Sequence, residues 1–95
     1  MAFKMSDLEE MFKCGKIFTG ECLGVALSPK SPNNKHVGFI FLVQKIDRVD
    51  RWEVLQDFVD VYWLPELTRL LTDAQSWIEA NCTKDPSGYG YLFKE

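Results

Sequence analysis

The segment 37–43, with the sequence VGFIFLV, constrains the fold more than any other part of the chain. A strand with one face in water alternates apolar and polar residues, whereas this run holds no polar side chain, so both of its faces need cover. A chain of 95 residues buries little more than about 60% of the surface that its unfolded form exposes. We therefore expect either that helices enclose a very small sheet or that a second protein surface supplies the missing cover.

The composition is that of one globular domain, which we place at residues 1–95. Hydrophobic residues make up 46% of the chain and charged residues 26%, far from a disordered composition. The longest apolar stretch is much shorter than a membrane span, and residues 1–7 lack the apolar core of a signal peptide. The three cysteines follow no disulfide pattern, which favours a reducing compartment. The sequence thus predicts a cytoplasmic protein that does not contact a membrane.

Charge is divided unevenly along the chain. Residues 1–46 hold six lysines and four acids, a balance of +2, and residues 47–95 hold five basic residues and ten acids, a balance of −5, which together give the net charge of −3. A nucleic-acid binder needs a dense basic face to release counterions from phosphates, so nucleic acid is an unlikely partner. The acidic half favours a basic protein partner instead.

Local patterns in the first half predict a short helix followed by a hairpin. The sequence SDLE at 6–9 is typical of a capping box, and Gly15 is a natural helix stop. Residues 21–28 then alternate bulky and small side chains, which indicates a strand. The turn formers of 29–36 predict an exposed loop that leads into the apolar strand.

The segment 47–63 has the pattern of a helix. Projection at about 100° per residue separates a narrow acidic arc from an apolar arc of roughly 200°, twice the width that a helix on a single surface needs. Such a helix must contact more than one neighbour. The acidic arc consists of Asp50, Glu53, Asp57 and Asp60.

A second helix is expected from Pro65 to Asn81, since proline at an early helical position loses no hydrogen bond. The sequence TDAQ at 72–75 offers another start for it. The composition of 89–93 predicts a closing strand. The element order is therefore α-β-β-α-α-β, an α+β domain with a small antiparallel sheet, made of the hairpin and the C-terminal strand, and two helices packed on one face.

The other face of this sheet has only the short first helix as cover. Either Phe39 and Phe41 or the alternate pair of apolar side chains points that way. Leaving such side chains in water forfeits about 1.5–3 kcal/mol each. We expect a homodimer, formed across the sheet or along its edge strand, with Phe39 and Phe41 as contact residues.

Catalytic and cofactor signatures are weak throughout. His36 is the single histidine, so neither a histidine-based triad nor a multi-histidine metal site can be built from one chain. The spacing of the cysteines resembles no zinc site, and the glycines form no phosphate-binding loop. We predict a protein that is not an enzyme and that needs no metal or cofactor.

Two interpretations of the acidic arc stay open, the solvated side of a helix and a docking stripe for a basic partner. Tryptophans in small domains usually lie in the core, yet they also dominate interface hot spots. Because the apolar arc is too wide for one surface, we expect Trp52 or Trp63 to reach a partner.

The leading hypothesis is a small non-catalytic interaction module of the inhibitor, immunity or accessory type. The acidic arc would steer a protein partner, and Trp52 and Trp63 would anchor it. The alternative is a homodimeric small-ligand-binding protein with a cavity between helices and sheet. That cavity would be lined by Phe39, Phe41, Phe58, Tyr62 and Trp77.

Overall fold

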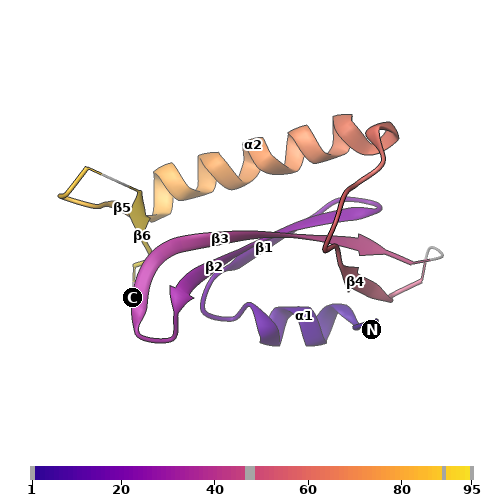
Figure 1. The fold of residues 1–95 in the computed structure, drawn as a ribbon, viewed down its shortest axis with the longest axis horizontal. Helices are drawn as coiled ribbons and strands as arrows, with labels where there is room; N and C mark the ends of the chain where they lie inside the picture. Colours follow the sequence, from indigo (N-terminus) through magenta and orange to yellow (C-terminus); the bar gives the residue numbers. More distant parts are fainter. Residues whose placement is uncertain (1, 47–48, 89, 95) are drawn as a thin grey trace.

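Two helices lie on opposite faces of a curled antiparallel sheet in the computed structural model, which describes residues 2–46, 49–88 and 90–94 (Figure 1). The predicted α+β class is confirmed. The expectation of two helices on one face is confirmed only in part, because each face carries one. In chain order the elements are α1 (Met5–Met11), β1 (Lys16–Thr19), β2 (Leu23–Ser31), β3 (Asn34–Lys45), β4 (Trp52–Val54), the 3₁₀ helix η1 (Val61–Trp63), α2 (Leu64–Asn81), β5 (Thr83–Lys84) and β6 (Tyr91–Leu92).

The sheet is built around the long β2–β3 hairpin. Its strand order is β1-β2-β3-β6-β5. Strand β4 is not part of this order and pairs with another portion of β3. The expected loop at 29–36 is wrong, since β2 continues to Ser31 and pairs there with Asn34. The register shifts on either side of Pro29, and a proline is tolerated at such an irregularity because no ladder hydrogen bond depends on its missing N–H.

The bulky face of β2 packs against α2, as the alternation of its side chains predicts. Leu23, Val25 and Leu27 are buried and form one core with Leu70 and Ala74 of the helix. Helix α2 starts at Leu64 with Pro65 in its first turn, so the expected second helix is confirmed. None of the described helices combines the length and the apolar character needed to cross a bilayer.

Helix α1 closes the opposite face with a second, smaller core of Leu8, Val43 and Trp52. On this face β2 contributes only small residues, and the bulk comes from β3. The side chain of Val43 fills the space over Gly24, where an added Cβ would lie 2.6 Å from the valine Cγ2. Helix α1 begins one residue before the predicted capping box, and the Asp7 carboxylate accepts a hydrogen bond from the Lys4 amide at 3.1 Å.

The helix expected over 47–63 is wrong. Asp47 and Arg48 lie outside the described residues, and the rest forms a strand, an irregular connection and η1. In β4, Trp52 pairs with Lys45 and Val54 pairs with Val43. The side chains of Trp52 and Val54 both lie in the α1-side core. Two residues that are two positions apart and point the same way have the side-chain period of a strand.

The chain closes with β5 and β6, as a shorter form of the expected C-terminal strand. Leu92 pairs with Thr83 on one side and with His36 of β3 on the other. Tyr89, the first residue of the expected strand, lies outside the described residues. Strands β6 and β4 pair with the same side of β3, β6 at His36 and β4 from Val43 to Lys45. The part of β3 between these positions has no partner strand on that side among the described residues.

Candidate interaction surface

The connection between β4 and α2 presents large apolar side chains to water. Phe58 is 83% exposed, Val61 78% and Tyr62 76%. Single exposed apolar residues are ordinary on protein surfaces, but a contiguous apolar patch marks an interaction site. We call residues 57–62 the exposed segment.

The exposed segment is held in place by residues that point inward. Val59 and Trp63 pack against the core between β2 and α2. Asp60 Oδ1 accepts the Tyr62 amide at 2.8 Å, and its carbonyl accepts the Trp63 amide at 2.9 Å. The rings of Tyr62 and Trp63 meet edge to face with centroids 5.0 Å apart. The outward side chains are therefore displayed on ordered backbone, which lowers the entropy lost on binding.

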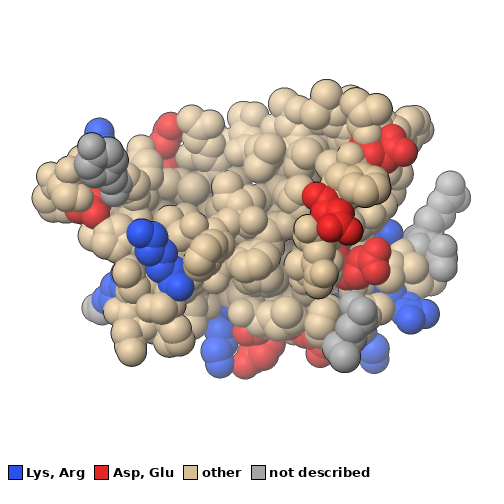
Figure 2. All heavy atoms as spheres, in the orientation of Figure 1, with Lys and Arg blue, Asp and Glu red and all other residues tan. Residues whose placement is uncertain are grey.

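Acidic groups accompany these apolar side chains. Asp57 and Asp60 are both exposed within the segment. Figure 2 shows acidic side chains at the right of the molecule, beside and below the start of α2, with basic side chains farther down on the same side. Apolar area with acidic neighbours is suited to a protein surface that is itself apolar with basic neighbours.

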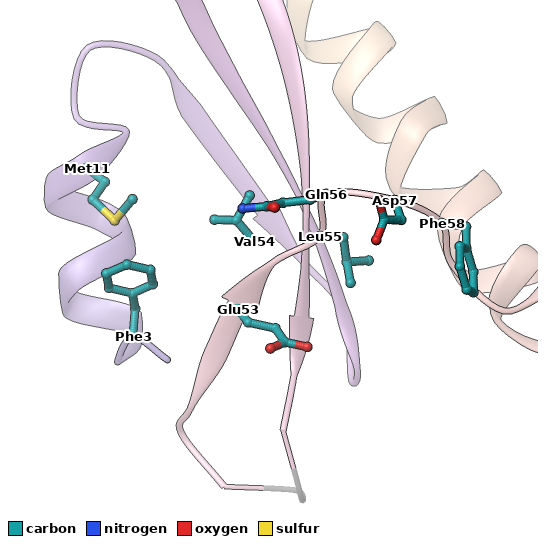
Figure 3. Close-up of a pocket in the computed structure, with 8 residues that line it drawn as sticks. All are labelled: Phe3, Met11, Glu53, Val54, Leu55, Gln56, Asp57 and Phe58. Atoms are coloured by element: carbon teal, nitrogen blue, oxygen red, sulfur yellow. The ribbon is translucent and has the colours of Figure 1, made fainter. Parts of the chain in front are cut away.

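A hollow of about 620 Å³ adjoins the segment on the α1 side. In Figure 3, Phe3 and Met11 face the residues of β4 and the following connection across an open space, and Phe58 lies farther along that connection. Glu53, half-buried on β4, and Asp57 also line it. The hollow thus continues the surface of the exposed segment toward α1.

Of the sequence-predicted partner residues, Trp52 and Trp63 point inward, and the four acidic residues lie at or near the surface. Asp50 accepts the Met5 amide at 3.0 Å and the Trp52 indole N–H at 3.2 Å, so it ties the start of α1 to β4. Trp52 is 4% exposed and lies in the α1-side core, and Trp63 is half-buried against the other core. The carboxylates of Asp50, Glu53, Asp57 and Asp60 lie at or near the surface, where their binding role stays a prediction.

The three exposed apolar side chains, Phe58, Val61 and Tyr62, are not among the partner residues that the sequence predicted, although Phe58 and Tyr62 were expected to line a ligand cavity. All three lie within the apolar arc assigned to the expected helix, so the sequence signal was present. Which aromatic side chains point outward depends on how the connection crosses between the two cores, and this is a property of the tertiary fold rather than of the pattern.

The five residues proposed for a ligand cavity are not brought together. Phe41 packs against Phe12 of α1 with ring centroids 5.5 Å apart, whereas Trp77 packs against Phe18 and the α2-side core. Phe58 and Tyr62 lie on the exposed segment. Phe39, predicted as a dimer contact, is 51% exposed on β3, and that role stays a prediction.

His36 serves as a link between turns. Its Nε2 lies 2.5 Å from Asp85 Oδ2, and its Nδ1 lies 2.7 Å from Asn34 Oδ1. The pKa of the Asp85 carboxyl is lowered to about 2. The largest cause is the hydrogen bond from the Ser87 backbone, and the next is the hydrogen bond from the His36 side chain. These contacts join the β2–β3 turn to the β5–β6 turn. Among the described residues, no three potential metal ligands form a cluster.

Comparisons with protein-family models, with curated proteins and with solved structures found no match to this chain.

Proposed function

We propose that this chain is a small protein-interaction module that binds the basic surface of a protein partner through the exposed segment 57–62. The observation that carries the proposal is the outward display of Phe58, Val61 and Tyr62 on backbone that inward residues hold in place. The proposal keeps the predicted combination of acidic groups and aromatic anchors. It moves the anchors from Trp52 and Trp63 to Phe58 and Tyr62.

The energetic argument rests on the size of these side chains. Full burial of one large apolar side chain is worth about 1.5–3 kcal/mol. Interface hot spots are enriched in tyrosine, and truncation of a hot-spot residue costs 2 kcal/mol or more, about thirtyfold in Kd. Three such side chains that are more than three-quarters exposed leave this energy available to an intermolecular contact.

The carboxylates of Asp57 and Asp60 supply steering and selectivity. Rim charges mainly raise the association rate with an oppositely charged partner, and salt screens this effect. We therefore expect binding that weakens as ionic strength rises. Because the connection carries no described nucleophile–base pair, the proposed action is occlusion or bridging of the partner.

Affinity capture with matched variants tests the proposal. The wild-type protein, Phe58→Ala, Tyr62→Ala and Asp57→Lys are compared as baits at low and high salt. We expect the wild type to capture at least one basic protein. The two aromatic variants should retain at least tenfold less of that protein. Asp57→Lys should weaken capture most at low salt.

Glu9→Lys is the matched charge-reversal control, because Glu9 is exposed on α1 and does not line the hollow beside the segment. Circular dichroism of each bait verifies the fold. The proposal is overturned when every captured protein binds Phe58→Ala and Tyr62→Ala as well as it binds the wild type, or when the charge reversals at 9 and 57 act alike.

A further inference from the structure

The middle of β3 has an open edge. On the side away from β2, β6 bridges β3 at His36, and β4 pairs with it from Val43 to Lys45. Two further hydrogen bonds close the ends of this gap, from Phe93 N to Lys35 O at 2.8 Å and from Leu55 N to Leu42 O at 2.7 Å. No described residue pairs with residues 38–41 on this side. We call these four residues the β3 gap.

Ile40 presents its backbone groups to the open edge of the β3 gap. The Leu42 carbonyl points to the β4 side, and backbone groups two residues apart along a strand point the same way. The N–H and C=O of Ile40 therefore face the open edge. At about 3.3 Å per residue the gap is about 13 Å long, room for one added strand of four to five residues.

The gap holds one of the devices that protect natural sheet edges: Ser28 pairs with Phe39 and Pro29 with Val37, so Gly38 is an extra residue in β3, as in a β-bulge. The sequence of the gap, GFIF, contains no charge and no proline, and Phe39 and Ile40 are 51% and 57% exposed. Proteins usually blunt such edges with lysine, proline or a covering element. An apolar edge left open is therefore either an aggregation hazard or a site for strand addition.

Hollows flank the gap on both faces of the sheet. On the α2 side, Ile40, Leu71, Ile78 and Tyr91 contribute to a mostly apolar hollow of about 360 Å³. On the α1 side, Phe39 and Phe41 lie at one end of a hollow of about 390 Å³, which extends across the hairpin to residues 28–32. Side chains on one face of an added strand would enter the α2-side hollow, and those on the other face would lie beside Phe39 and Phe41, which is how strand-adding domains read a peptide.

Each hollow has one charged residue in its lining. On the α2 side this residue is Glu79, and on the α1 side it is Lys30. A complementary strand carries apolar residues at every position in the gap, with a basic residue on its α2-facing side and an acidic residue on its α1-facing side.

The neighbours of the gap exclude a second copy of β3 as the added strand. Strand β3 has 12 residues, and in a symmetric pair its ends would overlap β4 and β6 of the other copy. A short extended segment avoids this clash. We propose that the β3 gap binds an extended, apolar peptide segment of another protein by strand addition. This site shares Met11 with the hollow beside the exposed segment, but it does not depend on the function proposed for that segment.

Nuclear magnetic resonance with a synthetic peptide tests the inference. The probe is KTVVLVVEG, which has lysine on one alternating face and glutamate on the other. We expect its addition to shift the amide signals of residues 38–41 and to slow hydrogen exchange of the Ile40 amide at least tenfold. The same peptide with N-methyl groups on alternate amides keeps its side chains but cannot pair, so its affinity should fall at least tenfold.

Ile40→Pro is the matching protein variant, because proline is tolerated on an edge strand where its N–H would face solvent. It should fold and bind the probe at least tenfold more weakly, whereas the control Ile40→Val should bind as the wild type does. If Ile40→Pro does not fold, the N-methylated peptide and the exchange rate decide. Four outcomes overturn the inference. The peptide does not bind at millimolar concentration, or its binding is unaffected by N-methylation. Alternatively, the signal shifts are confined to residues 57–62, or the protein forms a dimer that protects the Ile40 amide without peptide.

Discussion

Glu66 is expected to fix α2 to the sheet, and its replacement should destabilise the whole domain. One carboxylate oxygen, Oε2, accepts the backbone amides of Cys22 at 3.0 Å and of Leu23 at 2.6 Å. Cys22 lies in the turn between β1 and β2, and Leu23 is the first residue of β2. The side chain also lies against Gly20, where an added Cβ would come within 2.9 Å of it. The first turn of α2 is thus bonded directly to the start of the central hairpin.

The expected magnitude follows from these contacts. A hydrogen bond to a charged group contributes about 1.5–3 kcal/mol, and buried amides left without a partner add a cost of similar size. The two bonds share one oxygen and Glu66 is only half-buried, so we expect less than the sum, about 2–3 kcal/mol, for Glu66→Ala. Glu66→Gln keeps a neutral acceptor and should lose about half as much.

Thermal and urea unfolding, followed by circular dichroism, measure this effect. For a domain of this size 1 kcal/mol corresponds to about 4–8 °C, so Glu66→Ala should lower Tm by about 10–20 °C. Glu79→Ala is the control on the same helix, since Glu79 is exposed and accepts a 3.3 Å bond from the Gln75 side chain. That control should stay within about 0.5 kcal/mol of the wild type. A Glu66→Ala protein as stable as this control would refute the reasoning.

Three further predictions concern other sites. The pKa of Asp85 is lowered to about 2, chiefly by the Ser87 amide, so the stability that its carboxylate adds is present above the ordinary pKa of 3.8 and is lost as pH falls toward 2. The difference in urea midpoint between wild type and Asp85→Asn should therefore shrink from pH 4 to pH 2, and a constant difference would contradict this. Burial raises the pKa of the Cys82 thiol, so a disulfide reagent should modify exposed Cys14 at least about tenfold faster in the folded protein, and equal rates would count against the packing. Gly24→Ala places a Cβ 2.6 Å from a valine methyl on β3 and should cost about 1–3 kcal/mol in urea unfolding, whereas an unchanged midpoint would show that the site has room.

The elements that the sequence predicted well are those whose signals are local. Helix α2 has an apolar stripe at helical spacing and a proline in its first turn, and nothing in its surroundings opposes that preference. Strand β2 alternates bulky and small side chains, and its bulky face is the one packed against α2. In both cases the local preference and the tertiary contacts agree.

Residues 47–63 were misread because two different environments follow each other within one short segment. Trp52 and Val54 point into the α1-side core, and Val59 and Trp63 point into the α2-side core. A chain that crosses from one core to the other shows apolar residues on most of a projected circle. The roughly 200° arc was therefore a correct sign of two contacts, but a helix was the wrong element to make them.

The candidate site was predictable in composition and not in detail. Acidic residues and aromatic anchors were expected in this segment, and Asp57 and Asp60 do lie beside exposed aromatic side chains. Asp50 is exposed too, and it also bonds to the start of α1, 45 residues away in sequence. Such a contact depends on where α1 docks, and no local pattern encodes it.

The apolar segment of β3 is covered by the rest of the domain along only part of its length. Toward its C-terminal end, Leu42 and Val43 pack into opposite cores, so both faces are closed by α1, β4 and α2. Toward the β3 gap, β4 does not reach and β6 pairs with β3 only at His36, so Phe39 and Ile40 stay about half exposed. The short strands at the edge thus set the exposed apolar surface, and lengthening β4 by even two residues would begin to close it. A binding role for the gap explains why the chain tolerates an edge that a purely structural sheet would protect more fully.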